Sequence, residues 1–257
     1  MKNTFWPHTG RVLVQGLLLL CLRLAQNRTG FDPVTGLSVR SVPGLALIAC
    51  LLLCALAELI LCRKLSGERG EFAAHFAPPE RETLLLAAGS VLLAGGGALL
   101  LVSALPQRGL AAIAAGATAA ASGLGFLLLA KRFQAGAELS VLPVLPSMFF
   151  SVFFVLTVYL PAESDPVLAR YYIPVLASAL TAYAFSLLGG FLRKESSPRA
   201  FTFVADLAVL LCITALADAN GLGELLLFAG CALVLASFLA LRRETALDTP
   251  QAETGNP

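Results

Sequence analysis

PGLALIACLLLCALAELILC, residues 43–62, is a run of twenty residues in which Glu58 is the only charged side chain. As an α-helix, such a run extends about 30 Å, which matches the hydrocarbon core of a bilayer. Seven further stretches of about twenty mostly apolar residues share this character, and short charged loops separate them. We expect helices at residues 8–27, 43–63, 83–105, 109–131, 143–160, 169–192, 200–218 and 223–242. The sequence therefore predicts an all-α polytopic membrane bundle of eight transmembrane helices.

The composition indicates that lipid is part of the solvent. Of the 257 residues, 58% are hydrophobic and 13% are charged, whereas soluble domains carry roughly 25% charged residues. The net charge of +2 is spread among the loops, so we expect no nucleic-acid partner. We expect residues 1–243 to form a single membrane domain and the polar residues 244–257 to form a disordered cytoplasmic tail.

The basic residues differ in number between alternate loops. One set of loops, together with both termini, holds thirteen: Lys2, Arg11, Arg63, Lys64, Arg69, Arg81, Lys131, Arg132, Arg193, Lys194, Arg199, Arg242 and Arg243. The other set holds five: Arg23, Arg28, Arg40, Arg108 and Arg170. Because basic loops stay in the cytoplasm, this bias predicts that both termini are cytoplasmic.

The first apolar segment differs from the others. Its unbroken run, residues 12–22, is short and lies between Arg11 and Arg23. A spanning helix requires both Arg side chains to extend toward the membrane surfaces. Arg23 also stands where the small residues of a signal-peptidase site belong, so we expect a retained helix. A re-entrant or surface-lying segment is the alternative.

The densest polar cluster follows this segment on the expected outer side. Its candidate residues for binding an anion or a lipid headgroup are Arg23, Arg28, Asp32 and Arg40. Two guanidinium groups can hold a carboxylate or phosphate, and Asp32 would neutralise one of them. We expect residues 28–38 to be ordered and to pack near Tyr171 and Tyr172. In the alternative, the Arg side chains contact outer-leaflet phosphates and Asp32 pairs locally.

Two carboxylates, Glu58 and Asp206, lie within apolar stretches, where acids are costly and usually functional. If the helices bring them together, their mutual repulsion favours a bound proton or cation. The alternative is two separate ion pairs near the cytoplasmic interface, with Arg132, Arg193 or Arg199 as the partners.

The sixth stretch is the best candidate to line a cavity. It contains Pro174, which should kink a helix, and its polar candidates are Tyr171, Tyr172, Ser178 and Thr181. All six Cys residues lie in apolar stretches, so no disulfide framework is expected. Cys50, Cys54 and Cys62 share a broad helix face with Glu58, but Cys commonly serves as a small apolar residue. We expect no metal, no cofactor and no catalytic residue.

The third and fourth stretches are rich in small residues, which allow close helix approach in lipid. These are Ser90, Ala94, Ala98, Ala112, Gly116 and Ala120. They predict tight packing between the two neighbours or, as the alternative, a homodimer face. Asp-Pro-Val occurs at residues 32–34 and again at 165–167, which raises the possibility of two four-helix halves, 1–131 and 132–243.

RLAQNRTGFDPVTGL, residues 23–37, resembles the first outer loop of a group of polytopic membrane proteins of Firmicutes. SDPVLARY, residues 164–171, is similar to a second part of that group. The resemblance implies a bacterial cytoplasmic membrane and brings no activity.

Three functions fit these observations. The first is a small transporter or its membrane subunit, with a cavity between the sixth stretch and the loop at 23–40, coupled through Glu58 or Asp206. The second is a non-catalytic sensor, scaffold or accessory partner that docks through the small residues. The third is an intramembrane enzyme acting on lipid, which the lack of any catalytic motif disfavours.

Overall fold

The computed structural model describes residues 5–32, 39–63, 65, 69, 72–77, 83–106, 109–163 and 171–242. Its helices are α1 (Phe5–Thr29), α2 (Val42–Cys62), α3 (Phe72–His75), α4 (Thr83–Ala104), α5 (Leu110–Gln134), α6 (Leu145–Glu163), α7 (Tyr172–Leu192), α8 (Pro198–Ala215), the 3₁₀ turn η2 (Leu216–Asp218) and α9 (Leu222–Leu241). Within these residues, 7 helices are long and apolar enough to cross a membrane, and a shorter apolar helix covers Leu145–Thr157. An all-α bundle is therefore confirmed for the described residues, and its long apolar helices support a multi-pass membrane protein. The eighth span and the orientation of the chain stay predictions.

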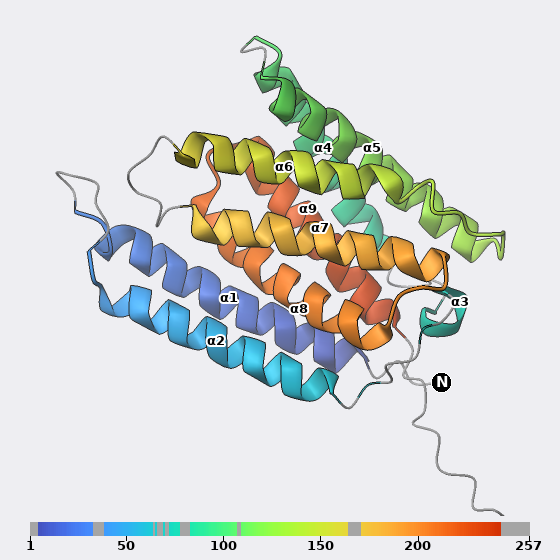
Figure 1. Ribbon diagram of the computed structural model, residues 1–257, viewed down its shortest axis with the longest axis horizontal. Helices are drawn as coiled ribbons and strands as arrows, with labels where there is room; N and C mark the ends of the chain where they lie inside the picture. The colour runs from blue at the N-terminus through green and yellow to red at the C-terminus, as the bar shows by residue number, and fades with distance from the viewer. Residues whose placement is uncertain are drawn as a thin grey trace, which may run out of the picture.

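Six helices form a closed ring, and two more lie outside it (Figure 1). Around the ring, α4 contacts α5, α5 contacts α6, α6 contacts α7, α7 contacts α8, α8 contacts α9, and α9 contacts α4. Outside the ring, α1 packs along α8, and α2 packs against α1. The long loop that joins α2 to α4 includes the short helix α3. We name the two ends of the bundle by residues of α1, the His8 end and the Asn27 end.

Local signals explain where several helices begin. Ser41 precedes α2, and its hydroxyl accepts a hydrogen bond from the Gly44 amide at 3.2 Å, with Pro43 in the first turn. Pro198 begins α8 in the same way. At the start of α9, the Glu224 carboxylate accepts a hydrogen bond from the Asn220 amide at 2.9 Å. Prolines and capping side chains thus set helix starts that apolar length alone leaves open.

Small residues bring α4 and α5 into close contact. A Cβ atom added at Gly97 would lie 2.7 Å from the Gly116 carbonyl oxygen, and one at Gly116 would lie 2.6 Å from the Leu101 amide. Ser90 and Ala94 lie against Gly123 in the same interface. Most of the small-residue surface is therefore used within the chain, as the tight-packing interpretation expects. Ala98 is exposed and Ala112 is half-buried.

The short helix α3 docks on the His8 end of the bundle through aromatic rings. Phe76 packs edge-on against Phe191 and Phe201, with ring centroids 5.2 and 5.7 Å apart. His75 is buried beside them. Burial, and then the positive charge of Arg242, lower the pKa of His75. The docked helix therefore favours a neutral histidine.

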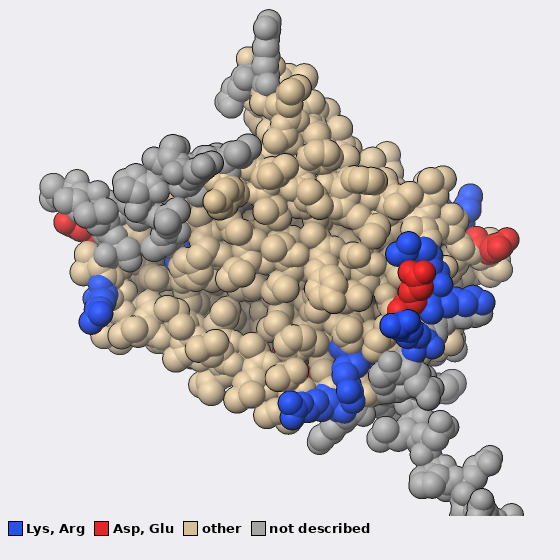
Figure 2. Space-filling model, in the orientation of Figure 1, with Lys and Arg blue, Asp and Glu red and all other residues tan. Residues whose placement is uncertain are grey.

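A wide uncharged surface lies between charged groups at the two ends (Figure 2). On α2, large apolar side chains face outward; Val42, Leu45, Leu52, Leu53 and Ile60 are all more than half exposed. A soluble monomer rarely exposes a continuous apolar surface of this kind. These side chains fit contact with lipid tails.

Candidate functional site

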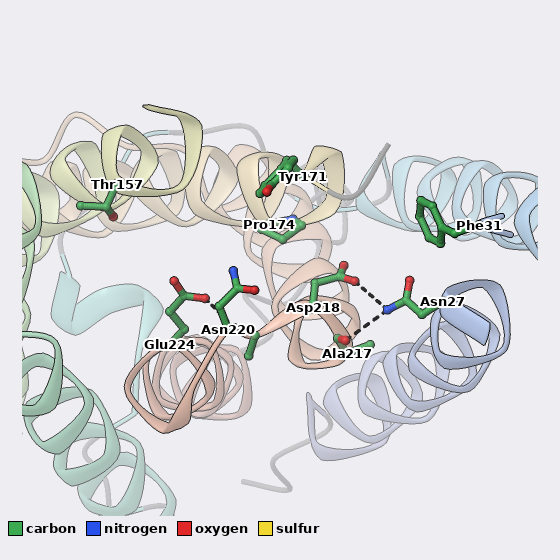
Figure 3. A pocket seen from close by; sticks show the side chains of 10 residues that line it. Asn27, Phe31, Thr157, Tyr171, Pro174, Ala217, Asp218, Asn220 and Glu224 are labelled. Atoms are coloured by element: carbon green, nitrogen blue, oxygen red, sulfur yellow. Dashed lines mark hydrogen bonds between the residues drawn. The ribbon is translucent and has the colours of Figure 1, made fainter. Parts of the chain in front are cut away.

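A cavity of about 450 Å³ opens at the Asn27 end, between α1, α6, α7, η2 and α9. We name it the outer cavity, after the expected outer loop that begins at this end of α1 (Figure 3). It is lined by Asn27, Phe31, Thr157, Tyr171, Pro174, Ala217, Asp218, Ala219, Asn220 and Glu224. Amides, carboxylates and aromatic rings thus converge on a volume typical of small-molecule sites.

A buried ion pair forms the wall of this cavity next to α1. The Arg23 side chain is 0% exposed, and its Nε donates to both Asp218 carboxylate oxygens at 3.0 and 2.8 Å. Its Nη1 donates to Gln26 Oε1 at 2.7 Å, and its guanidinium carbon lies 5.0 Å from the centre of the Tyr172 ring. Asn27 donates to Asp218 at 2.8 Å, as Figure 3 shows. These partners satisfy a guanidinium that burial would otherwise make very costly.

The expected outer-loop residues separate into two groups. Arg23 and Tyr172 are in contact, and Tyr171 lines the outer cavity. Arg28 and Arg40 are exposed. The carboxylate on Arg23 is that of Asp218, 195 residues away in the sequence, which sequence reasoning did not single out. The Arg23 guanidinium group is therefore already paired with the Asp218 carboxylate.

Asp32 is half-buried. The amide of Val39 donates to the Gly30 carbonyl at 2.8 Å, which holds the two described ends of this loop together. Residues 33–38, on which much of the loop prediction depends, lie outside the described residues, as do residues 164–167 of the second Asp-Pro-Val segment.

Ser178 and Thr181 lie deeper in the bundle than the outer cavity. Ser178 donates to the carbonyl of Pro174 at 2.9 Å, and the Thr181 hydroxyl lies 3.2 Å from Cys212 Sγ. Both residues border a gap with no room for a water molecule. They therefore contribute to packing between α7 and α8.

The two intramembrane acids meet at the opposite end. Glu58 of α2 and Asp206 of α8 are both 0% exposed. Arg11 Nη2 donates to Glu58 Oε2 at 2.6 Å, and His8 Nε2 lies 3.0 and 3.1 Å from the two Asp206 oxygens. One atom each from His8, Glu58 and Asp206 lies within 4.8 Å of the others. We name His8, Arg11, Glu58 and Asp206 the intramembrane cluster.

The partners of the acids come from α1, and the expected ones lie elsewhere. Arg193 pairs with Glu195 at 3.3 Å, and Arg199 donates to the carbonyl of Cys62 at 3.2 Å. Arg132 is exposed. The alternative prediction, that basic residues pair with the two acids, was therefore right about the interaction. It was wrong about the partners, which are His8 and Arg11. The sequence spacing of His8 and Arg11 could have indicated these partners, since residues three apart share one face of a helix.

Comparison with known proteins adds no family. No protein-family model, no curated protein and no solved structure matches this chain. The outer cavity and the intramembrane cluster are therefore the features that bear on function.

Hydrogen bonding orients the His8 ring between α1 and α8. Arg11 Nη2 lies 3.0 Å from His8 Nδ1. A guanidinium has only donors, so Nδ1 accepts, and Nε2 faces the Asp206 carboxylate.

Proposed function

We propose that this chain is a small transporter, or the membrane subunit of one, in a bacterial cytoplasmic membrane. In this proposal it has eight spans and both termini are cytoplasmic, so the outer cavity faces the outside. The observation that carries the proposal is that one helix, α1, forms part of both sites. It supplies Arg23 and Asn27 to the outer cavity and His8 and Arg11 to the intramembrane cluster.

The spacing along α1 is suited to coupling. Arg11 and Arg23 are twelve residues apart, which is about 18 Å along a helix axis. A shift of α1 along α8 would move His8 relative to Asp206 and Arg23 relative to Asp218 at once, because both acids belong to the α8–η2 segment. Coupled transport requires such a link between a solute site and an ion site.

The lining indicates the class of solute. Arg23 balances Asp218, so among the described lining residues Glu224 is the further acid, beside Asn27 and Asn220. Phe31 and Tyr171 add aromatic faces. Such a lining suits a small polar solute that is neutral or cationic, in place of the anion that the sequence suggested.

A second candidate is a non-transporting sensor or accessory subunit. The packed core between the two sites favours it, since Ser178 and Thr181 border no space for water. Transport instead requires that this core opens when α1 moves.

Native mass spectrometry of the gently solubilised protein tests the proposal. We expect a small polar molecule to be retained by the wild type. Ala219→Trp, which fills the outer cavity, should release it, whereas Ala135→Trp, at an exposed position after α5, should retain it. Retention of the same molecule by Ala219→Trp would contradict a solute site in this cavity.

A further inference from the structure

We infer that a groove at the His8 end of the bundle binds one anionic phospholipid, with its phosphate near basic side chains and its acyl chains against apolar ones. This inference goes beyond the proposed transport function. That the lipid belongs to the inner leaflet rests on the proposed orientation of the chain, whereas the binding itself does not.

The groove has a volume of about 470 Å³ and lies between α3, the end of α5 and the end of α7. We name it the His8-end groove. Its lining combines apolar and charged side chains, among them Phe72, Phe133, Leu139, Leu192, Glu138 and Lys194. A mixed lining of this kind suits a ligand with an apolar part and a charged part.

The groove lies where two apolar spans end. The spans of α5 and α7 run to Gln134 and Leu192. Phe133 and Leu192 therefore belong to the last turns of these spans, whereas Glu138 and Lys194 follow them in the chain. A phospholipid changes from acyl chains to a charged headgroup across the same boundary. The order of side chains in the groove thus matches the order of groups along a lipid.

The apolar side of the groove is fixed by α3. Phe72 packs edge-on against Phe133, with ring centroids 5.1 Å apart, and stacks on Phe76 at 4.5 Å. Phe76 packs in turn against Phe191, and both rings of α3 are buried. One aromatic cluster therefore joins α3 to the ends of α5 and α7 and gives the groove a well-packed wall.

Basic side chains outnumber acidic ones around the groove. Figure 2 shows Lys and Arg side chains gathered at the His8 end, near the ends of α5 and α7. The histidine of α3 favours its neutral form. The segments 72–77, 131–139 and 191–195 carry four basic and two acidic side chains, namely Lys131, Arg132, Arg193 and Lys194 against Glu138 and Glu195. These segments therefore have an excess of two positive charges.

Turns after α5 and α7 use several of the last helix carbonyls. Such carbonyls carry the partial negative charge of a helix C-terminus when they lack partners. After α5, the Ala137 amide donates to the Arg132 carbonyl at 3.0 Å, and after α7 the Glu195 amide donates to the Gly190 carbonyl at 2.9 Å. These bonds reduce the negative charge of the helix ends, so the basic side chains set the sign of the charge at the groove.

An anionic phospholipid is complementary to this arrangement. Basic pockets at the ends of transmembrane helices bind anionic headgroups, and each basic residue near the surface adds to the attraction. A zwitterionic lipid carries its own cation beside the phosphate and so gains less from an excess of positive charge. A free phosphate would leave the apolar wall without a ligand group.

Native mass spectrometry with competing lipids tests the inference. The full chain in mixed micelles is given equal amounts of phosphatidylglycerol and phosphatidylcholine with the same acyl chains. We expect the wild type to retain one phosphatidylglycerol in preference. K131Q/R132Q should lower this preference by about fivefold for each basic residue removed. R28Q/R40Q, which removes two exposed basic residues from the Asn27 end, should leave it unchanged.

Substitutions on α3 test the position of the lipid. A73W places a bulky side chain in the groove and should lose the lipid, whereas A74W, at the neighbouring exposed position outside the lining, should keep it. Retention by A73W would place the lipid elsewhere and overturn the inference. Equal retention of both lipids by the wild type, or an unchanged preference in K131Q/R132Q, would overturn it as well. An equal rise in melting temperature with glycerol phosphate and with phosphatidylglycerol would reassign the site to a free anion.

Discussion

The buried ion pair at the outer cavity allows a stringent test of the architecture. Arg23→Met preserves the length of the side chain and removes its charge, which leaves Asp218 buried without its cation. Removal of one partner from a buried pair costs about 3–5 kcal/mol, and this pair is nearly fully buried, with side chains 0% and 8% exposed. We therefore expect R23M to lower the free energy of unfolding by about that amount.

The double variant R23M/D218N is the matched comparison. It removes both charges and keeps an oxygen that can accept from Asn27, so much of the lost stability should return. We expect a coupling energy of about 2 kcal/mol in the double-mutant cycle, measured by reversible unfolding in mixed micelles. Additive losses from the two single variants would refute the ion pair as a structural element that joins α1 to the α8–η2 segment.

Three further predictions concern other parts of the chain. Gly97→Leu should prevent close packing of α4 on α5 and abolish a monodisperse protein, whereas Gly95→Leu, at a position with no atom within 4 Å, should be tolerated in size-exclusion chromatography. On a Cys-free background, an impermeant thiol reagent added outside should label Thr35→Cys and leave Glu68→Cys unlabelled; labelling of residue 68 would refute the proposed orientation. Because the pKa of His75 is lowered in the folded state, its contribution to stability is complete above its ordinary value of 6.5 and is lost as the pH falls through the lowered value. Melting curves should therefore show an acid-side loss that His75→Phe reduces, and an unchanged profile would exclude this source.

Local features of the helices were predictable from sequence. The apolar stretches and the charged loops between them placed most helix ends within a few residues of those observed. The docked helix α3 was not expected, because a segment of four residues has no measurable periodicity. Its position depends on aromatic contacts with three other segments of the bundle.

The neighbours of each helix were not predictable, and both sites depend on them. In lipid, an apolar residue can face tails or another helix equally well, so hydrophobic periodicity does not identify the buried side. The pairs His8–Asp206 and Arg23–Asp218 join residues 198 and 195 positions apart. One usable signal was present: the polar residues of α1 recur at helical spacing on one face, which must turn toward the bundle.

Solute-driven proton movement tests the central claim most directly. Protein reconstituted in liposomes that contain a pH-sensitive dye would be exposed to a panel of small neutral and cationic polar solutes at the Asn27 end. We predict that at least one solute changes the internal pH with the wild type and the E138Q control, and that E58Q abolishes the change. Folded, correctly oriented protein that moves no protons with any solute of the panel, or an E58Q variant that moves them as the wild type does, would contradict proton-coupled transport by this chain.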